Sequence, residues 1–149
     1  MSDDEKNKLK LIGKNEEDLK VISAYLQDSV VVVKDIVFLK KNRTFVMMVN
    51  RFMWEDVERG VFRESKRIRC AVKFDEVISV MSKNINQKNE NKPLECLAIE
   101  SSLTTEEKYK INIFFAGGGI ITIILEVIQV IMYDIGEPWL VKHVPKHKI

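Results

Sequence analysis

The sequence contains few of the residues from which disulfide frameworks and metal sites are built. Its 149 residues include only two cysteines and two histidines, and neither pair has the spacing of a zinc motif. Cys70 and Cys96 each lie in an apolar run, so we expect free thiols that pack as small apolar side chains, with one disulfide as the alternative. His143 and His147 flank Pro145, which breaks the helical spacing that a metal site would need. The sequence therefore predicts no metal and no cofactor.

The sequence also lacks an excess of charge of one sign. It has 24 basic and 22 acidic residues, a formal net charge of +2, so any attraction to a polyanion must come from a local patch. With 46% hydrophobic and 31% charged residues it is typical of a globular protein and not of a disordered one. The length fits one domain, which we expect over residues 9–141, with a flexible tail at 1–8 and a basic tail at 142–149.

No segment has the composition of a signal peptide or of a membrane-spanning helix. The first six residues are polar and acidic, without an apolar stretch behind them. Residues 111–132 are apolar and long enough to cross a bilayer, but three consecutive glycines at 117–119 and the carboxylate of Glu126 interrupt them. The glycines lack the lysine of a phosphate-binding loop and predict a hairpin turn. We expect a cytoplasmic protein without a membrane span.

Hydrophobic periodicity predicts one helix near each end of the chain. Residues 16–28 place apolar side chains at helical spacing behind Asn15, a suitable N-cap. Residues 126–135 show a second apolar stripe, and Gly136 and Pro138 suit the end of that helix. Between the helices, alternating or β-branched runs predict strands at 30–33, 36–39, 44–52, 67–74, 77–81, 94–100, 109–115 and 120–125.

These elements predict an α+β fold. Short connections favour antiparallel pairing, and a sheet of about seven or eight strands curls to protect its edges. We therefore expect a strongly bent antiparallel sheet or a partly open barrel, with an N-terminal helix and a C-terminal helix. Pleckstrin-homology-like barrels share a strand-rich body and a closing C-terminal helix, although a fold of that kind fixes no chemistry.

Short motifs along nearly the whole chain share the order and spacing of one protein family. They are Leu9-Lys10-Leu11, Glu17-Asp18-Leu19, Ser23-Ala24, Leu26-Gln27-Asp28, Asn50-Arg51-Phe52, Trp54-Glu55, Phe115-Ala116-Gly117-Gly118-Gly119, Asp134-Ile135-Gly136 and Trp139. From Leu9 to His147 the chain resembles an uncharacterised alphaproteobacterial family, of the domain of unknown function 2948 type. The resemblance implies a bacterial, cytoplasmic, single-domain protein, and it brings no known activity and no catalytic residues.

The first candidate site is a cluster of cations, here called the basic ribbon. Its members lie within 15 residues: Arg59, Arg63, Lys66, Arg67, Arg69 and Lys73. Strand alternation places Arg67, Arg69 and Lys73 on one face, where they could contact the phosphates of RNA, a nucleotide or a lipid headgroup. The alternative is a solvated outer face whose charge is offset by the acidic residues between positions 55 and 64.

The second candidate site is a polar cluster. It consists of Asp28, Asp35, Asn50, Arg51, Trp54 and Glu55. In a functional interpretation Arg51 binds an anion, and a carboxylate of the cluster acts as acid or base. In the structural interpretation, which we favour, a buried Arg51 pairs with a carboxylate because an unpaired buried charge is costly.

Taken together, these features favour a small non-enzymatic binding module. The basic ribbon would contact a protein or an anionic, phosphate-bearing partner, and a protein partner or a second copy of the chain is expected before nucleic acid. The alternative is a small hydrolase-like enzyme that uses Asp28 or Asp35 together with Arg51.

Overall fold

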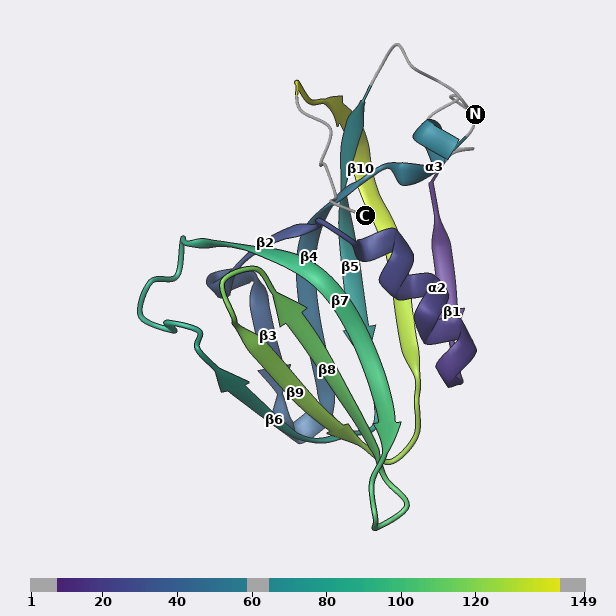
Figure 1. The fold of residues 1–149 in the computed structure, drawn as a ribbon, viewed down its shortest axis with the longest axis vertical. Helices are drawn as coiled ribbons and strands as arrows, with labels where there is room; N and C mark the ends of the chain where they lie inside the picture. Colours follow the sequence, from purple (N-terminus) through teal and green to yellow (C-terminus); the bar gives the residue numbers. More distant parts are fainter. Residues whose placement is uncertain (1–7, 59–64, 143–149) are drawn as a thin grey trace.

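The computed structural model describes residues 8–58 and 65–142 (Figure 1). Within them the chain forms ten strands, two α-helices and two short 3-10 turns. In chain order these are β1 (Lys10–Gly13), α2 (Glu16–Leu26), β2 (Val30–Val32), η1 (Val33–Asp35), β3 (Ile36–Leu39), η2 (Lys40–Asn42), β4 (Thr44–Phe52), α3 (Trp54–Glu58), β5 (Lys66–Phe74), β6 (Val77–Lys83), β7 (Pro93–Leu103), β8 (Tyr109–Phe115), β9 (Ile120–Leu125) and β10 (Val130–Leu140). The predicted tails, with His143 and His147, lie outside the described residues apart from positions 8 and 142.

The strands form one open antiparallel sheet in the described part of the chain. Its order is β1-β10-β5-β4-β2-β7-β8-β9-β6, and β3 pairs with β4 beside β2. Strand β2 joins two halves of the sheet because it pairs with β4 on one side and with β7 on the other. Figure 1 shows the second half, β7, β8, β9 and β6, folded over in front of β3 and β4. The inner side chains of both halves therefore meet in one core.

Strand alternation fills this core. The inner side chains of β4 and β5 include Phe45, Met47, Val49, Cys70 and Val72, all at most 2% exposed. A buried aliphatic or aromatic side chain contributes about 1.5–3 kcal/mol when it leaves water. Both cysteines are free and buried, so the alternative of a disulfide is not realised. Helix α2 packs against β7 and β1 and adds three buried side chains, Leu19, Ile22 and Leu26.

The predicted α+β fold class is wrong, because the residues that the structure describes form mostly antiparallel sheet. Residues 126–135 do not form a helix, because Val130–Leu140 is strand β10, which pairs with β5. Along it Val130, Met132 and Asp134 are buried while the residues between them face outward, which is the period of a strand. Strand β1 precedes α2, so neither end of the described residues is helical. The sheet is open, and the analogy with pleckstrin-homology-like barrels, which depended on a closing helix, does not hold.

The apolar stretch at residues 111–132 is divided among β8, β9 and β10. The glycine turn closes the β8–β9 hairpin: the Phe115 N–H donates to the Gly119 carbonyl oxygen at 2.8 Å, and Gly117 and Gly118 have φ of 85° and 88°. Such positive values favour glycine. No helix in residues 8–58 and 65–142 is long and apolar enough to cross a membrane.

Candidate functional site

Arg51 lies at the centre of the polar cluster and is fully buried. Its Nε and Nη2 atoms each donate a hydrogen bond of 2.7 Å to the carboxylate of Asp134. Its Nη1 and Nη2 atoms donate to the carboxylate of Glu55 at 2.9 and 2.7 Å, and Nη1 also donates to the Phe52 carbonyl oxygen at 3.4 Å. Because a guanidinium has five N–H groups, these contacts use all of them. Arg51 therefore ties β4 to α3 and β10, and it has no donor left for a substrate.

The charge of Arg51 is balanced by the two carboxylates. Burial is the largest single influence on the pKa of Arg51 and lowers it, but the hydrogen bonds and charges of Asp134 and Glu55 together raise this pKa above its ordinary value. The backbone holds Asp134 as well: the Leu9 N–H donates to its carboxylate at 2.8 Å, and its own N–H donates to the Leu9 carbonyl oxygen at 2.9 Å. The guanidinium also lies 5.8 Å from the centre of the Tyr25 ring. The result is a fixed ion network.

Asp35 lies on the opposite side of the sheet from Arg51. Its carboxylate accepts a hydrogen bond of 3.2 Å from Arg69, which also donates to the side chain of Asn50 at 3.3 Å. Asn50 and Arg51 are neighbours in β4, so their side chains point to opposite faces. The structure therefore does not bring Asp35 to Arg51.

Asp28 and Trp54 anchor the start of β2. The Asp28 N–H donates to the Cys96 carbonyl oxygen at 2.7 Å, and the Asp28 carbonyl oxygen accepts a bond of 3.0 Å from Arg67. The indole N–H of Trp54 donates to the Gln27 carbonyl oxygen at 2.9 Å. The Asp28 carboxylate influences the pKa of Arg67, whereas Arg51 is held by Asp134 and Glu55 and Asp35 accepts a hydrogen bond from Arg69.

The described part of the basic ribbon lies on β5. Lys73 pairs with the carboxylate of Asp75 at 3.6 Å. Arg69 pairs with that of Asp35 at 3.2 Å. Arg67 donates to two backbone carbonyl oxygens at 3.0 and 3.1 Å; burial lowers its pKa, and two nearby carboxylates oppose that effect. By alternation Lys66 belongs to the other face. Two predicted members lie outside the described residues, Arg59 and Arg63.

Strand β10 places an apolar side chain directly opposite each of the three outward cations of β5. We call the result the cationic–apolar face, which consists of three cross-strand pairs: Arg67 with Trp139, Arg69 with Ile135, and Lys73 with Ile131. Trp139 and Ile135 are 39% and 38% exposed, as is Tyr133 at 39%. Exposed aromatic side chains and arginine are the residues on which protein interfaces depend most.

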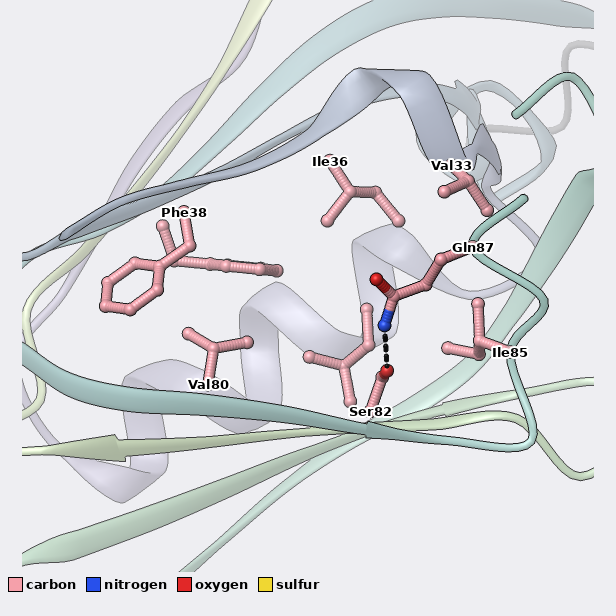
Figure 2. A pocket seen from close by; sticks show the side chains of 9 residues that line it. Val33, Ile36, Phe38, Val80, Ser82, Ile85 and Gln87 are labelled. Carbon is pink, nitrogen blue, oxygen red and sulfur yellow. Dashed lines mark hydrogen bonds between the residues drawn. The ribbon is translucent and has the colours of Figure 1, made fainter. Parts of the chain in front are cut away.

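A second feature is the gap between the free edges of β3 and β6, here called the seam. Within the described residues β3 pairs only with β4, and β6 only with β9. A backbone hydrogen bond closes each end of the seam. At one end the Val77 N–H donates to the Arg43 carbonyl oxygen at 2.9 Å, and at the other end the Lys34 N–H donates to the Glu90 carbonyl oxygen at 3.1 Å. Between them lies a cavity of about 260 Å³, lined by Val33, Ile36, Phe38, Phe45, Val80, Ser82, Ile85, Gln87 and Ile121 (Figure 2).

Comparison with known proteins gives a family and no activity. The family described as Protein of unknown function (DUF2948) matches residues 9–147. The chain belongs to the DUF2948 family. No curated protein and no solved structure matches it. The family resemblance seen in the sequence is therefore confirmed, and the alphaproteobacterial origin stays a prediction.

This DUF2948 structure offers no cluster of three His, Cys, Asp or Glu side chains that could hold a metal ion within residues 8–58 and 65–142. Burial raises the pKa of Cys70 and of Cys96 to about 12, and negative charge from nearby aspartates acts in the same direction. Metal binding by cysteine requires the thiolate, so neither residue is suited to that role near neutral pH.

The sequence did not reveal the β10 half of the cationic–apolar face in this DUF2948 chain. Ile131 and Ile135 fall within the range 126–135, for which helical spacing of the apolar side chains predicts a helix, and Trp139 follows the expected end of that helix. The sequence from Val130 to Ile135 is apolar on both faces of a strand except for Asp134, so it carries no alternation, and the strand period is visible only in which residues are buried. The same assignment hid Asp134, the carboxylate that pairs with Arg51.

Proposed function

We propose that this DUF2948 protein is a small, cytoplasmic, non-enzymatic binding module that docks a protein partner on the cationic–apolar face. The observation that carries the proposal is the register of β5 and β10, in which each outward cation lies opposite an apolar side chain. A partner that presents apolar side chains together with carboxylates would complement both components of this face.

The state of the three cations favours a protein over a polyanion. Arg69 and Lys73 already pair with carboxylates, with side chains 37% and 42% exposed, and Arg67 is bonded to backbone carbonyl oxygens. Nucleic-acid affinity depends on many cations that are available to phosphates. The three cations instead give the face a moderate positive charge beside the exposed apolar side chains of β10.

Photo-crosslinking in the source cell tests the proposal. A photoreactive phenylalanine analogue replaces Tyr133, and mass spectrometry identifies the crosslinked product. We expect one discrete protein adduct, whose yield falls severalfold in Ile135→Asp and in Arg69→Gln. The matched control is Leu97→Asp, since Leu97 is a 42% exposed apolar residue on β7, away from the face, and should leave the yield unchanged.

Other adducts would give the face a different occupant. A nuclease-sensitive adduct would indicate RNA, and a product of twice the chain's mass would indicate a second copy. Either result, or a yield that Leu97→Asp lowers as much as Ile135→Asp, would contradict the proposed protein partner.

A further inference from the structure

We propose that the seam is a binding site for a small apolar molecule, a fused ring or branched chain that carries one hydrogen-bonding group. The cavity lies between β3 and β6 and is lined mostly by apolar side chains that pack against the core. The cationic–apolar face lies on the outer side of β5 and β10. This inference goes beyond the proposed function and does not depend on it.

The closed ends of the seam restrict its occupant to a small molecule. Neighbouring strands lie about 4.8 Å apart, so an inserted peptide strand would need β3 and β6 to stand about twice that distance apart along their length. The bonds from Val77 to Arg43 and from Lys34 to Glu90 keep the two sides in direct contact at each end. Arg43 also pairs with two carboxylates there, at 3.7 and 3.5 Å. A peptide strand could therefore not insert between β3 and β6 unless these contacts broke. A small molecule could fill the cavity between the two closed ends while the contacts stay intact.

The interior of the cavity is apolar and continuous with the core. Phe45 and Ile121 form its deep end, since they are 1% and 4% exposed. Figure 2 shows Phe38 and Ile36 facing Val80 across the cavity. A cavity of about 150 Å³ with aliphatic walls stays dry and binds benzene. The seam, at about 260 Å³, is therefore large enough for a bicyclic ring.

Gln87 supplies a polar contact at the mouth of the cavity. Its Nε2 donates to the Ser82 Oγ at 2.9 Å, and Figure 2 shows the amide directed over the apolar side chains. Both residues are exposed, so their polar atoms mark the boundary between the apolar interior and solvent. A ligand with one hydroxyl group can bury its apolar part and place the hydroxyl against the Gln87 amide, an arrangement common in small-molecule sites.

The test uses naphthalene and 2-naphthol, which differ by one hydroxyl group. Each is titrated into methyl-labelled full-length protein, and NMR follows the methyl shifts of Ile36, Val80 and Ile121. We expect saturable shifts, with 2-naphthol bound about fivefold more tightly because of one additional hydrogen bond. Val80→Phe fills the cavity and should weaken the binding of both probes by about tenfold or more.

Two further variants separate the site from general apolar binding. Met81→Phe, at the exposed neighbouring position in β6, should leave the affinity for both probes unchanged. Gln87→Leu should abolish the preference for 2-naphthol and leave naphthalene binding unchanged. If circular dichroism shows Val80→Phe to be unfolded, Ile36→Phe fills the cavity from the opposite side. Shifts that do not saturate, or that persist in the filled variant, would overturn the proposal.

Discussion

Arg51 in β4 and Asp134 in β10 are joined by two hydrogen bonds of 2.7 Å across the intervening strand β5. The two residues are 83 positions apart in the sequence, and both side chains are fully buried. The pair connects β4 to β10 over β5 through side chains, in addition to the backbone bonds of the sheet. Removing the cation would leave the carboxylates of Asp134 and Glu55 with no compensating charge in the interior.

Arg51→Met should destabilise the protein by about 3–5 kcal/mol, the usual cost of breaking a buried ion pair on one side. Urea denaturation monitored by tryptophan fluorescence measures the loss. The triple variant Arg51→Met/Glu55→Gln/Asp134→Leu should recover much of it, because no buried charge is then left alone. A matched surface control is Lys20→Ala, since the Lys20–Glu17 pair is exposed and should contribute little stability. A triple variant no more stable than Arg51→Met would contradict this account.

The buried thiols should make the protein less stable as the pH rises above 9. Burial raises the pKa of Cys70 and Cys96 to about 12, whereas thiols in the unfolded chain lose their protons near pH 8.5. Between these values the unfolded state binds fewer protons than the folded state, so the free energy of unfolding falls with pH. The slope is at most about 1.4 kcal/mol per pH unit for each thiol, measured by urea denaturation between about pH 8 and pH 10.5.

The control for the thiol effect is the double variant Cys70→Ala/Cys96→Ala. The variant removes the two thiols and no other ionisable group, so the difference between the pH profiles of the two proteins isolates the thiols. We expect a shallower loss of stability in the variant above about pH 9. Parallel profiles would show that the thiols do not couple to unfolding.

Gly13 in β1 packs closely against residues of β10 and α2. A Cβ atom at this position would lie 2.7 Å from the Val130 Cγ1 and 3.0 Å from the Ile22 Cδ1. Val130 is fully buried and β-branched, so it cannot turn aside freely. Gly13→Ala should therefore cost about 1–3 kcal/mol in the free energy of unfolding. In the Val130→Ala background the same change should cost less, and strictly additive effects in this double-mutant cycle would disprove the contact.

Asn15 caps helix α2. Its Oδ1 accepts a hydrogen bond of 2.8 Å from the Asp18 N–H, and the Asp18 carboxylate accepts one of 2.9 Å from the Lys14 N–H. Asn15→Ala should reduce stability by about 1 kcal/mol, visible as a lower midpoint in urea. Asn15→Ser keeps an acceptor in place and should retain most of the stability; equal losses in the two variants would argue against the cap.

The local hydrophobic pattern of the sequence is sufficient to predict strands that pair with a strand nearby in the sequence. The predicted ranges 36–39, 44–52, 109–115 and 120–125 coincide with β3, β4, β8 and β9. In each case alternation or a β-branched run agrees with a short connection to the partner strand. The glycine turn between β8 and β9 was predicted for the same reason.

Local pattern was not sufficient where the deciding partner is distant. The apolar residues of 126–135 fit both helical and strand periods, and pairing with β5 selects the strand. Gly136, expected to end a helix, instead has a φ of 75° within the irregular part of β10 between Ile135 and Trp139. Strand β1 was overlooked because its partner in the sheet is β10. The sequence predicts that a buried Arg51 pairs with a carboxylate. It does not identify Asp134 as the partner, because only the pairing of β10 with β5 brings Asp134 close to Arg51.

The position of β10 in the sheet also affects how the polypeptide emerges from the ribosome. Strand β5 ends at Phe74, yet its neighbour β10 is completed only at Leu140, about 66 residues later. At about 5–20 residues per second, one edge of β5 stays without its partner for roughly 3–13 s during translation. A nascent chain with an open strand edge is prone to wrong pairing, so this protein would benefit from a holding chaperone until its last strand is made.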